Sequence, residues 1–239
     1  MQVKVIRSEI DGVKFCHRDG FSDLKTFNEV LGKRSYLCRG LKIEPNERWM
    51  DCGGNVGAFA LLACSQGADV VVYEPDPNNC KMIQKNLDLN GFKAKVVQAA
   101  LVADDTKSAI LHLGNNNNVW RNSLIKKWNS KGIKVPCLNF DDEVSRHGFN
   151  ACKMDIEGAE MPILESTNSI FDKLTYEWSF DIDRSLPRIW KVLDRQKQQY
   201  GEVKAPWNTV KYNTRDYSEW QSSWFPPCVL VHCFRRPLI

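Results

Sequence analysis

The sequence of 239 residues lacks the features that mark several large classes of protein. No apolar run approaches the ~18 residues of a membrane-spanning helix, so we expect no membrane span. The N-terminus, MQVKVIRSEIDG, has no apolar core of the kind found in a secretory signal. The net charge of +4 is compatible with an anionic substrate but too small to indicate a nucleic-acid-binding surface.

The nine cysteines do not form the pattern of a metal site or of an extracellular disulfide framework. They occur singly, no CxxC pair is present, and the four histidines are scattered along the chain. Small buried thiols in a reducing compartment explain this pattern better than a zinc cluster does. We therefore expect a cytoplasmic protein.

The length and composition suit one large α/β domain, with a hydrophobic content of 43% and a charged content of 26%. Residues 1–40 mix short apolar stretches with several glycines. We expect them to form a lead-in of short strands or a helix that belongs to the same domain. Residues 41–239 are expected to form the main body of that domain.

Strands and helices are predicted to alternate from residue 48 onward. Short apolar runs are typical of strands buried in a parallel sheet, and apolar residues at helical spacing indicate the helices between them. The predicted strands are 48–52, 69–73, 95–102, 109–113, 135–138, 151–154, 174–180 and 229–234, and the predicted helices are 58–64, 78–89, one that begins at 161–164, and 186–200. This order predicts an α/β fold with a mostly parallel central sheet, helices on both faces and all strands in one sheet.

The turn after the first of these strands has the composition of a nucleotide-binding loop. The segment WMDCGGNVG places glycines where a strand must turn sharply into a helix and where a ligand can approach the backbone. A dinucleotide site requires glycine at the position of Asn55, and Asp51 adds negative charge where a phosphate would lie. S-adenosylmethionine (SAM) has no phosphate and carries two cationic groups, so both residues favour SAM over NAD. Glu74, at the end of the next strand, can accept both ribose hydroxyls.

Four segments in order, MDCGGNVG, VVVYEPDPNN, KNLDLNG and KMDIEGAE, resemble the FkbM family of SAM-dependent methyltransferases. The first three segments are shared by many methyltransferases, whereas Lys153–Glu160 is the marker specific to this family. Enzymes of the family often act on oxygen atoms of sugars and other small natural products. The resemblance covers roughly residues 36–180. It implies a class I, Rossmann-like methyltransferase fold for residues 41–239.

The resemblance also implies which residues hold SAM. The glycine turn would lie beside the methionine part, Glu74 would bind the ribose, and the residues after the second and third strands would lie around the adenine. The implied cofactor-binding residues are Asp51, Gly53, Gly54, Asn55, Gly57, Glu74, Pro75, Asp76, Ala100, Leu101 and Asp155.

Carboxylates at the ends of the later strands are the candidates for catalysis. Asp155 follows the strand 151–154, at the edge where open α/β sheets bind ligands. An alcohol is a poor nucleophile, so a carboxylate base or a bound Mg²⁺ or Mn²⁺ would help to remove its proton. Asp155 is the first candidate for base or metal ligand and Glu157 the second. Glu177 is a third catalytic candidate, although a structural ion pair explains it equally well, and we interpret Glu160 as favouring a helix N-terminus.

Two further segments have compositions that suit an acceptor. Asn115–Asn118 with Trp120, Arg121 and Asn122 form a polar, aromatic loop that could bind a saccharide, although a plain surface loop explains it as well. The tryptophans near the C-terminus could stack on a sugar or base, or could belong to the core. These are Trp207, Trp220 and Trp224.

The sequence favours O-methylation of a sugar, a glycan or another small-molecule hydroxyl. One alternative is an RNA or DNA methyltransferase, but amino-methylating enzymes of that kind usually carry a [DNS]-P-P-[FYW] segment after the fourth strand. The segment Met154–Gly158 occupies that place here. A second alternative is a catalytically inactive SAM-binding subunit, against which the intact cofactor residues argue.

Overall fold

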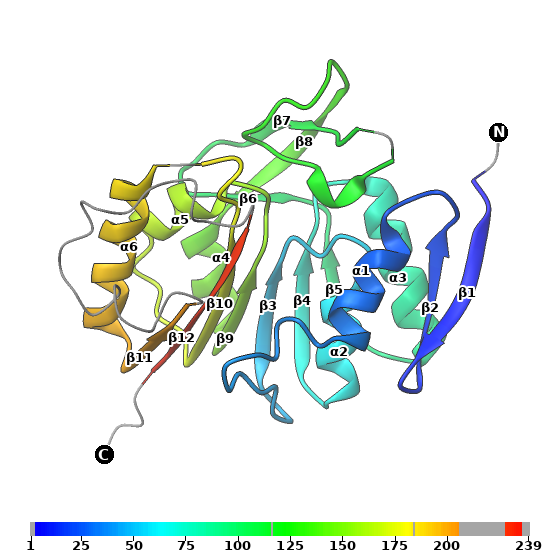
Figure 1. Ribbon diagram of the computed structural model, residues 1–239, viewed down its shortest axis with the longest axis horizontal. Coiled ribbons are helices and arrows are strands. Elements are labelled where there is room, and N and C mark those ends of the chain that lie inside the picture. Colours follow the sequence, from blue (N-terminus) through cyan, green and yellow to red (C-terminus); the bar gives the residue numbers. More distant parts are fainter. Residues whose placement is uncertain (1–2, 116, 184, 206–227, 236–239) are drawn as a thin grey trace.

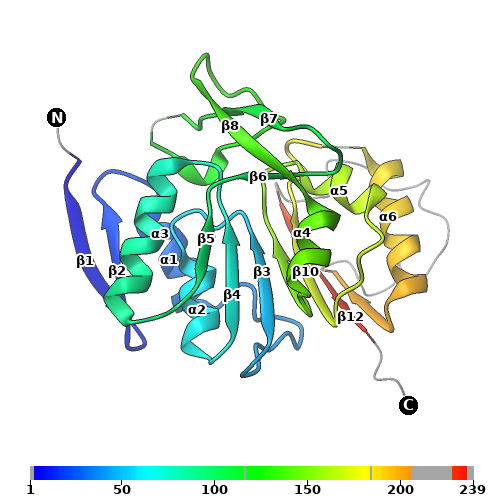
Figure 2. The same cartoon turned by 180° about the vertical axis from the view of Figure 1, so that it is seen from behind.

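A seven-stranded sheet forms the centre of the computed structural model, which describes residues 3–115, 117–183, 185–205 and 228–235 (Figures 1 and 2). From one edge to the other its strands are β5 (Lys95–Val97), β4 (Asp69–Tyr73), β3 (Arg48–Cys52), β9 (Ala151–Met154), β10 (Lys173–Trp178), β12 (Val229–Phe234) and β11 (Glu202–Lys204). The strands from β5 to β10 pair in parallel, whereas β12 is antiparallel to both of its neighbours. The predicted mostly parallel sheet is therefore confirmed.

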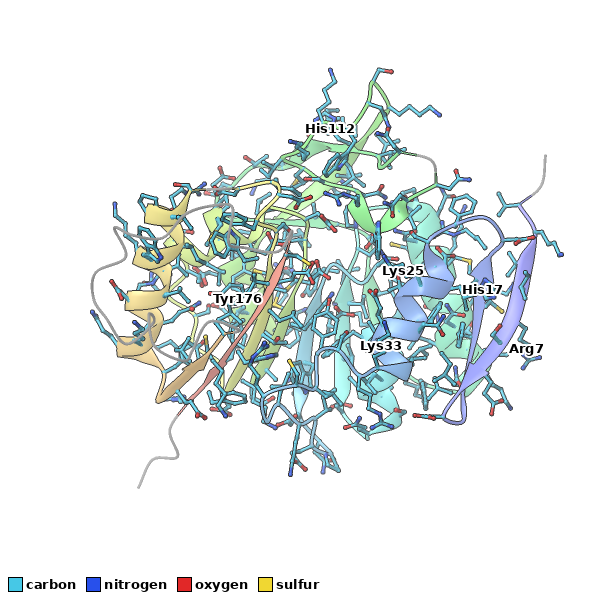
Figure 3. The ribbon with its side chains drawn as sticks, in the orientation of Figure 1. Arg7, His17, Lys25, Lys33, His112 and Tyr176 are labelled. Atoms are coloured by element: carbon cyan, nitrogen blue, oxygen red, sulfur yellow. The ribbon has the colours of Figure 1, made fainter. Side chains whose placement is uncertain are left out.

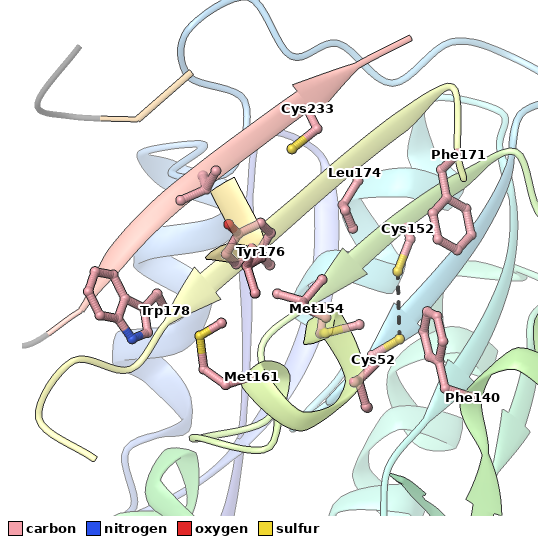
Figure 4. Close-up of a cluster of buried hydrophobic side chains, with 14 of the residues drawn as sticks. Cys52, Phe140, Cys152, Met154, Met161, Phe171, Leu174, Tyr176, Trp178 and Cys233 are labelled. Carbon is pink, nitrogen blue, oxygen red and sulfur yellow. Dashed lines mark hydrogen bonds between the residues drawn. The ribbon is translucent and has the colours of Figure 1, made fainter. Parts of the chain in front are cut away.

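Helices cover both faces of this sheet, as predicted. One face carries α1 (Asp23–Phe27), α2 (Ala58–Ser65) and α3 (Pro77–Asn90), and the other carries α4 (Phe140–His147), α5 (Glu160–Ser166) and α6 (Leu186–Gln199). Successive strand residues point to opposite faces, so Trp49 packs in one apolar cluster and Met50 in the other. Figure 4 shows the cluster that contains Met50, in which the sulfur atoms of Cys52 on β3 and Cys152 on β9 lie 3.8 Å apart.

The strand order creates a ligand crevice at the carboxyl edge of the sheet. The chain enters the sheet at β3, proceeds outward through β4 to β5, and then returns to the other side of β3 as β9. Open α/β sheets bind ligands where the strand order reverses in this way. The crevice therefore lies between the loop after β3 and the loop after β9.

The strands between β5 and β9 form a separate sheet, so the expectation of one continuous sheet is wrong. The predicted strand 95–102 is two strands, because the Val97 carbonyl accepts from the N–H groups of Glu74 (3.1 Å) and Ala99 (3.0 Å) and the chain turns there. Beyond the turn, β6 (Ala100–Val102) pairs with β8 (Gly132–Asn139), which pairs with β7 (Ser108–His112). Figure 2 shows this small sheet across the carboxyl edge of the large one. An apolar run indicates a strand but not the sheet that the strand joins.

The N-terminal forty residues contain a β-hairpin, helix α1 and a π-helical turn. The hairpin consists of β1 (Val5–Ile10) and β2 (Val13–Arg18), and the turn η1 spans Asn28–Gly32. Asn86 on α3 joins β2 to the main body, since its side chain accepts from the backbone N–H of Cys16 at 2.6 Å. No helix in the described ranges is long and apolar enough to cross a membrane.

Candidate functional site

Close packing of backbone explains the glycines in the turn between β3 and α2. Gly53 has φ +83°, and a Cβ at this position would lie 1.9 Å from the Asp155 carbonyl oxygen. A Cβ on Gly54 would lie 2.2 Å from a methyl group of Val72. Because neither contact is tolerable, both positions require glycine. Gly57, with φ +90°, begins α2 from a left-handed conformation.

Glu74 is a buried carboxylate at the end of β4 that faces this turn. Its Oε2 accepts the N–H of Asn55 at 2.7 Å, and its Oε1 accepts the N–H of Asp76 at 2.9 Å. Burial raises the pKa of Glu74 to about 7, although both hydrogen bonds lower it. The carboxylate therefore links the glycine turn to the start of α3, where Asp76 caps the helix by accepting the N–H of Asn78.

Asp51 lies beneath the turn, where it forms an ion pair with Lys153 of the neighbouring strand. Asp51 is fully buried, and its Oδ1 is 3.1 Å from the Lys153 Nζ, which also donates to the carbonyl of Gly53 at 2.7 Å. Burial raises the pKa of Asp51, and Lys153 opposes that effect. Burial lowers the pKa of Lys153, but Asp51 and then Asp155 outweigh it and hold it at about 12. The ion pair of Asp51 and Lys153 therefore holds the glycine turn in place through the bond to the Gly53 carbonyl.

Two adjoining clefts open at this edge of the sheet. The narrow cleft, of about 50 Å³, lies between the turn and the small sheet. The wide cleft, of about 420 Å³, extends toward α1 and β10. Five residues line both clefts: Gly53, Asn55, Trp120, Asp155 and Glu157.

The predicted cofactor residues divide between these clefts. The side chain of Asn55 lies where the clefts meet, and its buried Oδ1 has no hydrogen-bond partner among the described residues. The narrow cleft is also lined by Glu74, Pro75, Ala100 and Leu101, and the wide cleft by Gly54. The residues that line neither are Asp51, Gly57 and Asp76.

Asp155 occupies the position where the two clefts meet. Its backbone N–H donates to the carbonyl of Cys52 at 3.0 Å, which continues the pairing of β3 and β9 beyond the strand ends. The hydroxyl of Tyr36 donates to its Oδ2 at 2.5 Å. Asp155 Oδ1 receives no hydrogen bond from the described residues.

Glu160 shapes the loop that follows Asp155. Its carboxylate accepts the N–H of Ile156 at 2.6 Å and the N–H of Gly158 at 2.8 Å, and it is the first residue of α5. Burial, followed by the charge of Asp155, raises its pKa to about 8. Glu160 therefore has the local structural position that we expected. The turn it supports leaves Glu157 with φ +52°, a strained backbone conformation for a residue other than glycine.

Glu157 and Glu177 face the wide cleft together with Asp155. Burial raises the pKa of Glu157 well above its ordinary value, and Asp155 and Glu177 raise it further. Burial also raises the pKa of Glu177 to about 8, with a second contribution from Asp155. Within the described part of the chain neither carboxylate forms an ion pair, so the structural ion pair considered for Glu177 is not found there.

A metal site was the other use considered for these carboxylates. In residues 3–115, 117–183, 185–205 and 228–235 no group of three or more His, Cys, Asp or Glu side chains could hold a metal ion. The divalent cation at Asp155 and Glu157 stays a prediction.

A polar, aromatic rim from the 3-10 turn η2 (Val119–Arg121) borders both clefts. Lys25 on α1, labelled in Figure 3, places its Nζ 3.8 Å from the centre of the Trp120 ring. Arg121 forms an ion pair with Asp181, and Asn122 accepts the N–H of Gly114 at 2.9 Å. Of the loop predicted to bind an acceptor, Trp120, Arg121 and Asn122 line these clefts. Asn115 and Asn117 line a separate hollow beside Asp76, and position 116 lies outside the described residues. Trp207, Trp220 and Trp224 also lie outside them.

Two residues of the site were missed by sequence reasoning. Lys153 carries a signal, because a lysine inside the apolar strand ACKM needs a buried partner, and the pairing of β3 and β9 places it opposite Asp51. Tyr36 carries none, because it lies 119 residues from Asp155 in the chain.

Comparison with known proteins identifies the family of this chain. The family model described as the methyltransferase FkbM domain matches residues 51–202, well over half of the chain. No curated protein matches the sequence.

Solved structures with a similar arrangement include three methyltransferases. The FkbM methyltransferase of Methylobacillus flagellatus has 14% identity and a TM-score of 0.48, over 81% of this chain and 45% of that one. The 16S rRNA N2 G1207 methyltransferase of T. thermophilus has 12% identity and a TM-score of 0.45, over 99% and 52%. A dimethyladenosine transferase of Plasmodium falciparum has 13% identity and a TM-score of 0.49, over 86% and 62%.

The chain spans about half the length of the first two of these structures. The assignment rests on the family model, whose range begins at Asp51 in β3 and includes Glu74, Lys153 and Asp155. With its Rossmann-like sheet and this match, the chain belongs to the FkbM methyltransferase domain family.

Proposed function

We propose that this chain is a SAM-dependent methyltransferase that methylates a hydroxyl oxygen of a saccharide or another small molecule. The observation that carries the proposal is the position of Asp155. Asp155 lines both the narrow cleft beside the glycine turn and the wide cleft, and its carboxylate accepts the hydroxyl of Tyr36, which lines the wide cleft. One side chain can therefore reach a donor in the first cleft and an acceptor in the second.

The residues around the glycine turn carry groups that fit SAM, which is larger than the narrow cleft of about 50 Å³ and would extend along Gly53 and Asn55 into the wide cleft. The unpartnered Oδ1 of Asn55 can accept a hydrogen bond from the ammonium group of the methionine part. Glu74 has acceptor capacity beyond its two backbone bonds and can bind ribose hydroxyls. Ala100 and Leu101 provide an apolar wall for adenine. Bound SAM supplies a methyl group that its sulfonium already activates.

The chain's own residues would then serve one displacement. The wide cleft holds the acceptor so that its oxygen, the methyl carbon and the sulfur lie in line. As the new O–C bond forms and the C–S bond breaks, Asp155 accepts the hydroxyl proton through its free Oδ1. Glu157 and Glu177 are the second and third candidates for this proton acceptor, because both face the same cleft.

The rim of the wide cleft supports a saccharide as the acceptor. Trp120 offers an aromatic face of the kind on which sugar rings stack, and Lys25 and Arg121 offer hydrogen-bond donors beside it. These groups support a hydroxyl-rich acceptor rather than a specific sugar.

The test is transfer of labelled methyl from SAM to saccharides, other hydroxyl compounds, RNA and DNA, with and without a chelator. We expect label in a hydroxyl compound, and a loss of label with the chelator would support the cation at Asp155 and Glu157. Label in nucleic acid alone would support the nucleic-acid alternative. SAM binding in calorimetry without transfer to any acceptor would support the inactive subunit.

The Asp155→Asn variant tests the role of the carboxylate. We expect kcat to fall by ~10²–10⁴-fold, because general base catalysis contributes that much, while the Kd for SAM stays close to the wild-type value. Asp172→Asn is the control, because the exposed carboxylate of Asp172 pairs with Arg235 at the opposite end of the strands and lines neither cleft. Full activity in Asp155→Asn would exclude Asp155 as the base.

A further inference from the structure

Tyr36 connects the N-terminal part of the chain to the catalytic candidate Asp155. It lies before the range 51–202 that matches the family, in the segment between η1 and β3. Its hydroxyl is 2.5 Å from Asp155 Oδ2, and its side chain is buried. The contact therefore joins two segments of the site that the sequence separates widely.

The direction of this hydrogen bond is fixed by the phenol. Burial raises the pKa of Tyr36 well above its ordinary value, and the charge of Asp155 raises it further. Tyr36 consequently keeps its proton at working pH and always donates. Oδ2 of Asp155 therefore holds the Tyr36 hydroxyl, whereas Oδ1 receives no hydrogen bond from the described residues.

The ring of Tyr36 has little freedom to move. It packs edge-on against Phe59 of α2, with 5.6 Å between ring centres. The Lys153 Nζ lies 5.5 Å from the ring centre and is held by its own bonds to Asp51 and Gly53. A donor held on two sides can fix the carboxylate that it contacts, which is how supporting residues orient catalytic groups.

We propose that Tyr36 is a positioning residue for the transfer step, holding the Asp155 carboxylate so that Oδ1 points to the acceptor hydroxyl. The proposal rests on the proposed function, in which Asp155 accepts the proton. It also means that the segment before residue 51, outside the matched family range, supplies part of the catalytic site.

The first test is Tyr36→Phe, which keeps the ring and removes the hydroxyl. We expect kcat to fall by ~10–100-fold because a small misplacement of a catalytic group costs about that much, while KM and Kd for SAM stay near wild type. Tyr176→Phe is the matched control, because the hydroxyl of this buried tyrosine donates to Gln196 at 3.0 Å in the core. The melting temperature of Tyr176→Phe should fall by about as much as that of Tyr36→Phe, whereas the kcat of Tyr176→Phe should not change.

The second test places Tyr36→Phe in the Asp155→Asn background. A residue that acts only through Asp155 should cost nothing further there, whereas a merely structural role would add its own loss. Two results would overturn the positioning role of Tyr36 without affecting the proposed function. One is an unchanged kcat in Tyr36→Phe, and the other is a kcat in the double variant that falls below that of Asp155→Asn by the whole factor lost in Tyr36→Phe. A wild-type chain that transfers methyl to no acceptor would instead defeat the proposed function, and this assignment with it.

Discussion

The two sides of the crevice treat their buried carboxylates differently. On the narrow-cleft side, Glu74 receives the backbone N–H groups of Asn55 and Asp76. On the wide-cleft side, Glu157 and Glu177 form no ion pair with any described residue, and burial raises both pKa values. The first side is already organised around fixed hydrogen bonds, as suits one constant ligand. The second gives Glu157 and Glu177 no backbone hydrogen bonds of this kind among the described residues, although the Cys228 thiol donates to Glu177, as suits chemistry on the acceptor.

The two sides also differ in how the chain builds them. The turn residues 53–57 and Glu74 belong to consecutive elements, β3, α2 and β4. The wide cleft instead combines Lys25, Tyr36, Trp120 and Glu177, which come from four distant parts of the sequence. The glycine turn and Glu74 thus form a local structure that one motif can encode, whereas the remaining walls of both clefts come together only after the chain has folded.

The largest effect is expected from Gly53→Ala, which would break the narrow side. The new Cβ would lie 1.9 Å from the Asp155 carbonyl oxygen, so the loops after β3 and β9 must separate. We expect SAM affinity to fall by more than ~100-fold, because a displacement of about 1 Å disrupts a preorganised site to that extent. Calorimetry with SAM measures the effect.

Gly12→Ala is the control for Gly53→Ala. Gly12 has a similar φ of +79°, but nothing lies within 4 Å of an added Cβ. It should cost about 1 kcal/mol of stability through backbone strain alone, with unchanged SAM affinity. Equal SAM affinities in Gly53→Ala and Gly12→Ala would show that close packing at Gly53 is irrelevant to the ligand.

A smaller effect is expected from Glu74→Gln, which sharpens the contrast between the sides. The amide turns one acceptor oxygen into a donor that faces a backbone N–H. Hydrogen bonds to charged groups contribute about 1.5–3 kcal/mol, so we expect the Kd for SAM to rise roughly 10–100-fold. In the assay for methyl transfer, kcat at saturating SAM should change much less.

The control for this variant is Glu165→Gln, which breaks an exposed ion pair with Arg188. Exposed pairs contribute ~1 kcal/mol or less to stability, and this one lies far from both clefts, so SAM affinity should not change. A loss of kcat rather than of SAM affinity in Glu74→Gln would place Glu74 on the catalytic side and remove the contrast.

Much of the fold was predictable because its strands and helices have strong local patterns. The apolar run of β4 and the helix α3, which Asp76 caps and Gly91 ends, lie within a residue or so of their predicted bounds. The small sheet was not predictable, because β6 continues the apolar run of β5 and only the hydrogen bonds to Val97 reveal the turn. Periodicity reports a strand and says nothing of its partner.

The residues of the site likewise divide into those that the sequence could place and those that it could not. The glycine turn and Glu74 could be placed at the sheet edge from sequence, because the spacing of strand and helix determines where they lie. The ion pair of Asp51 with Lys153 and the contact of Tyr36 with Asp155 depend on strand pairing and loop packing. No local signal encodes a contact over 119 residues.

The smallest effect on SAM binding is expected from Glu160→Gln, which tests whether burial outweighs backbone hydrogen bonds in the loop after β9. Glu160 has two backbone N–H partners, as Glu74 does, yet burial raises its pKa to about 8 from an ordinary 4.5. The folded protein therefore keeps a proton that the unfolded chain releases above pH 4.5. Stability from this group is full below that pH and falls as the pH rises toward 8.

Glutamine does not titrate, so Glu160→Gln should flatten the decline in melting temperature between pH 5 and pH 8. A shift from 4.5 to about 8 corresponds to a difference on the order of 4 kcal/mol between pH 5 and pH 8, or roughly 8–16 °C. Glu165→Gln is again the control, because Arg188 lowers the pKa of Glu165 and its titration ends below this window. An unchanged slope in Glu160→Gln would mean that the two backbone N–H groups offset the burial and that the pKa of Glu160 stays near its ordinary value in the folded protein.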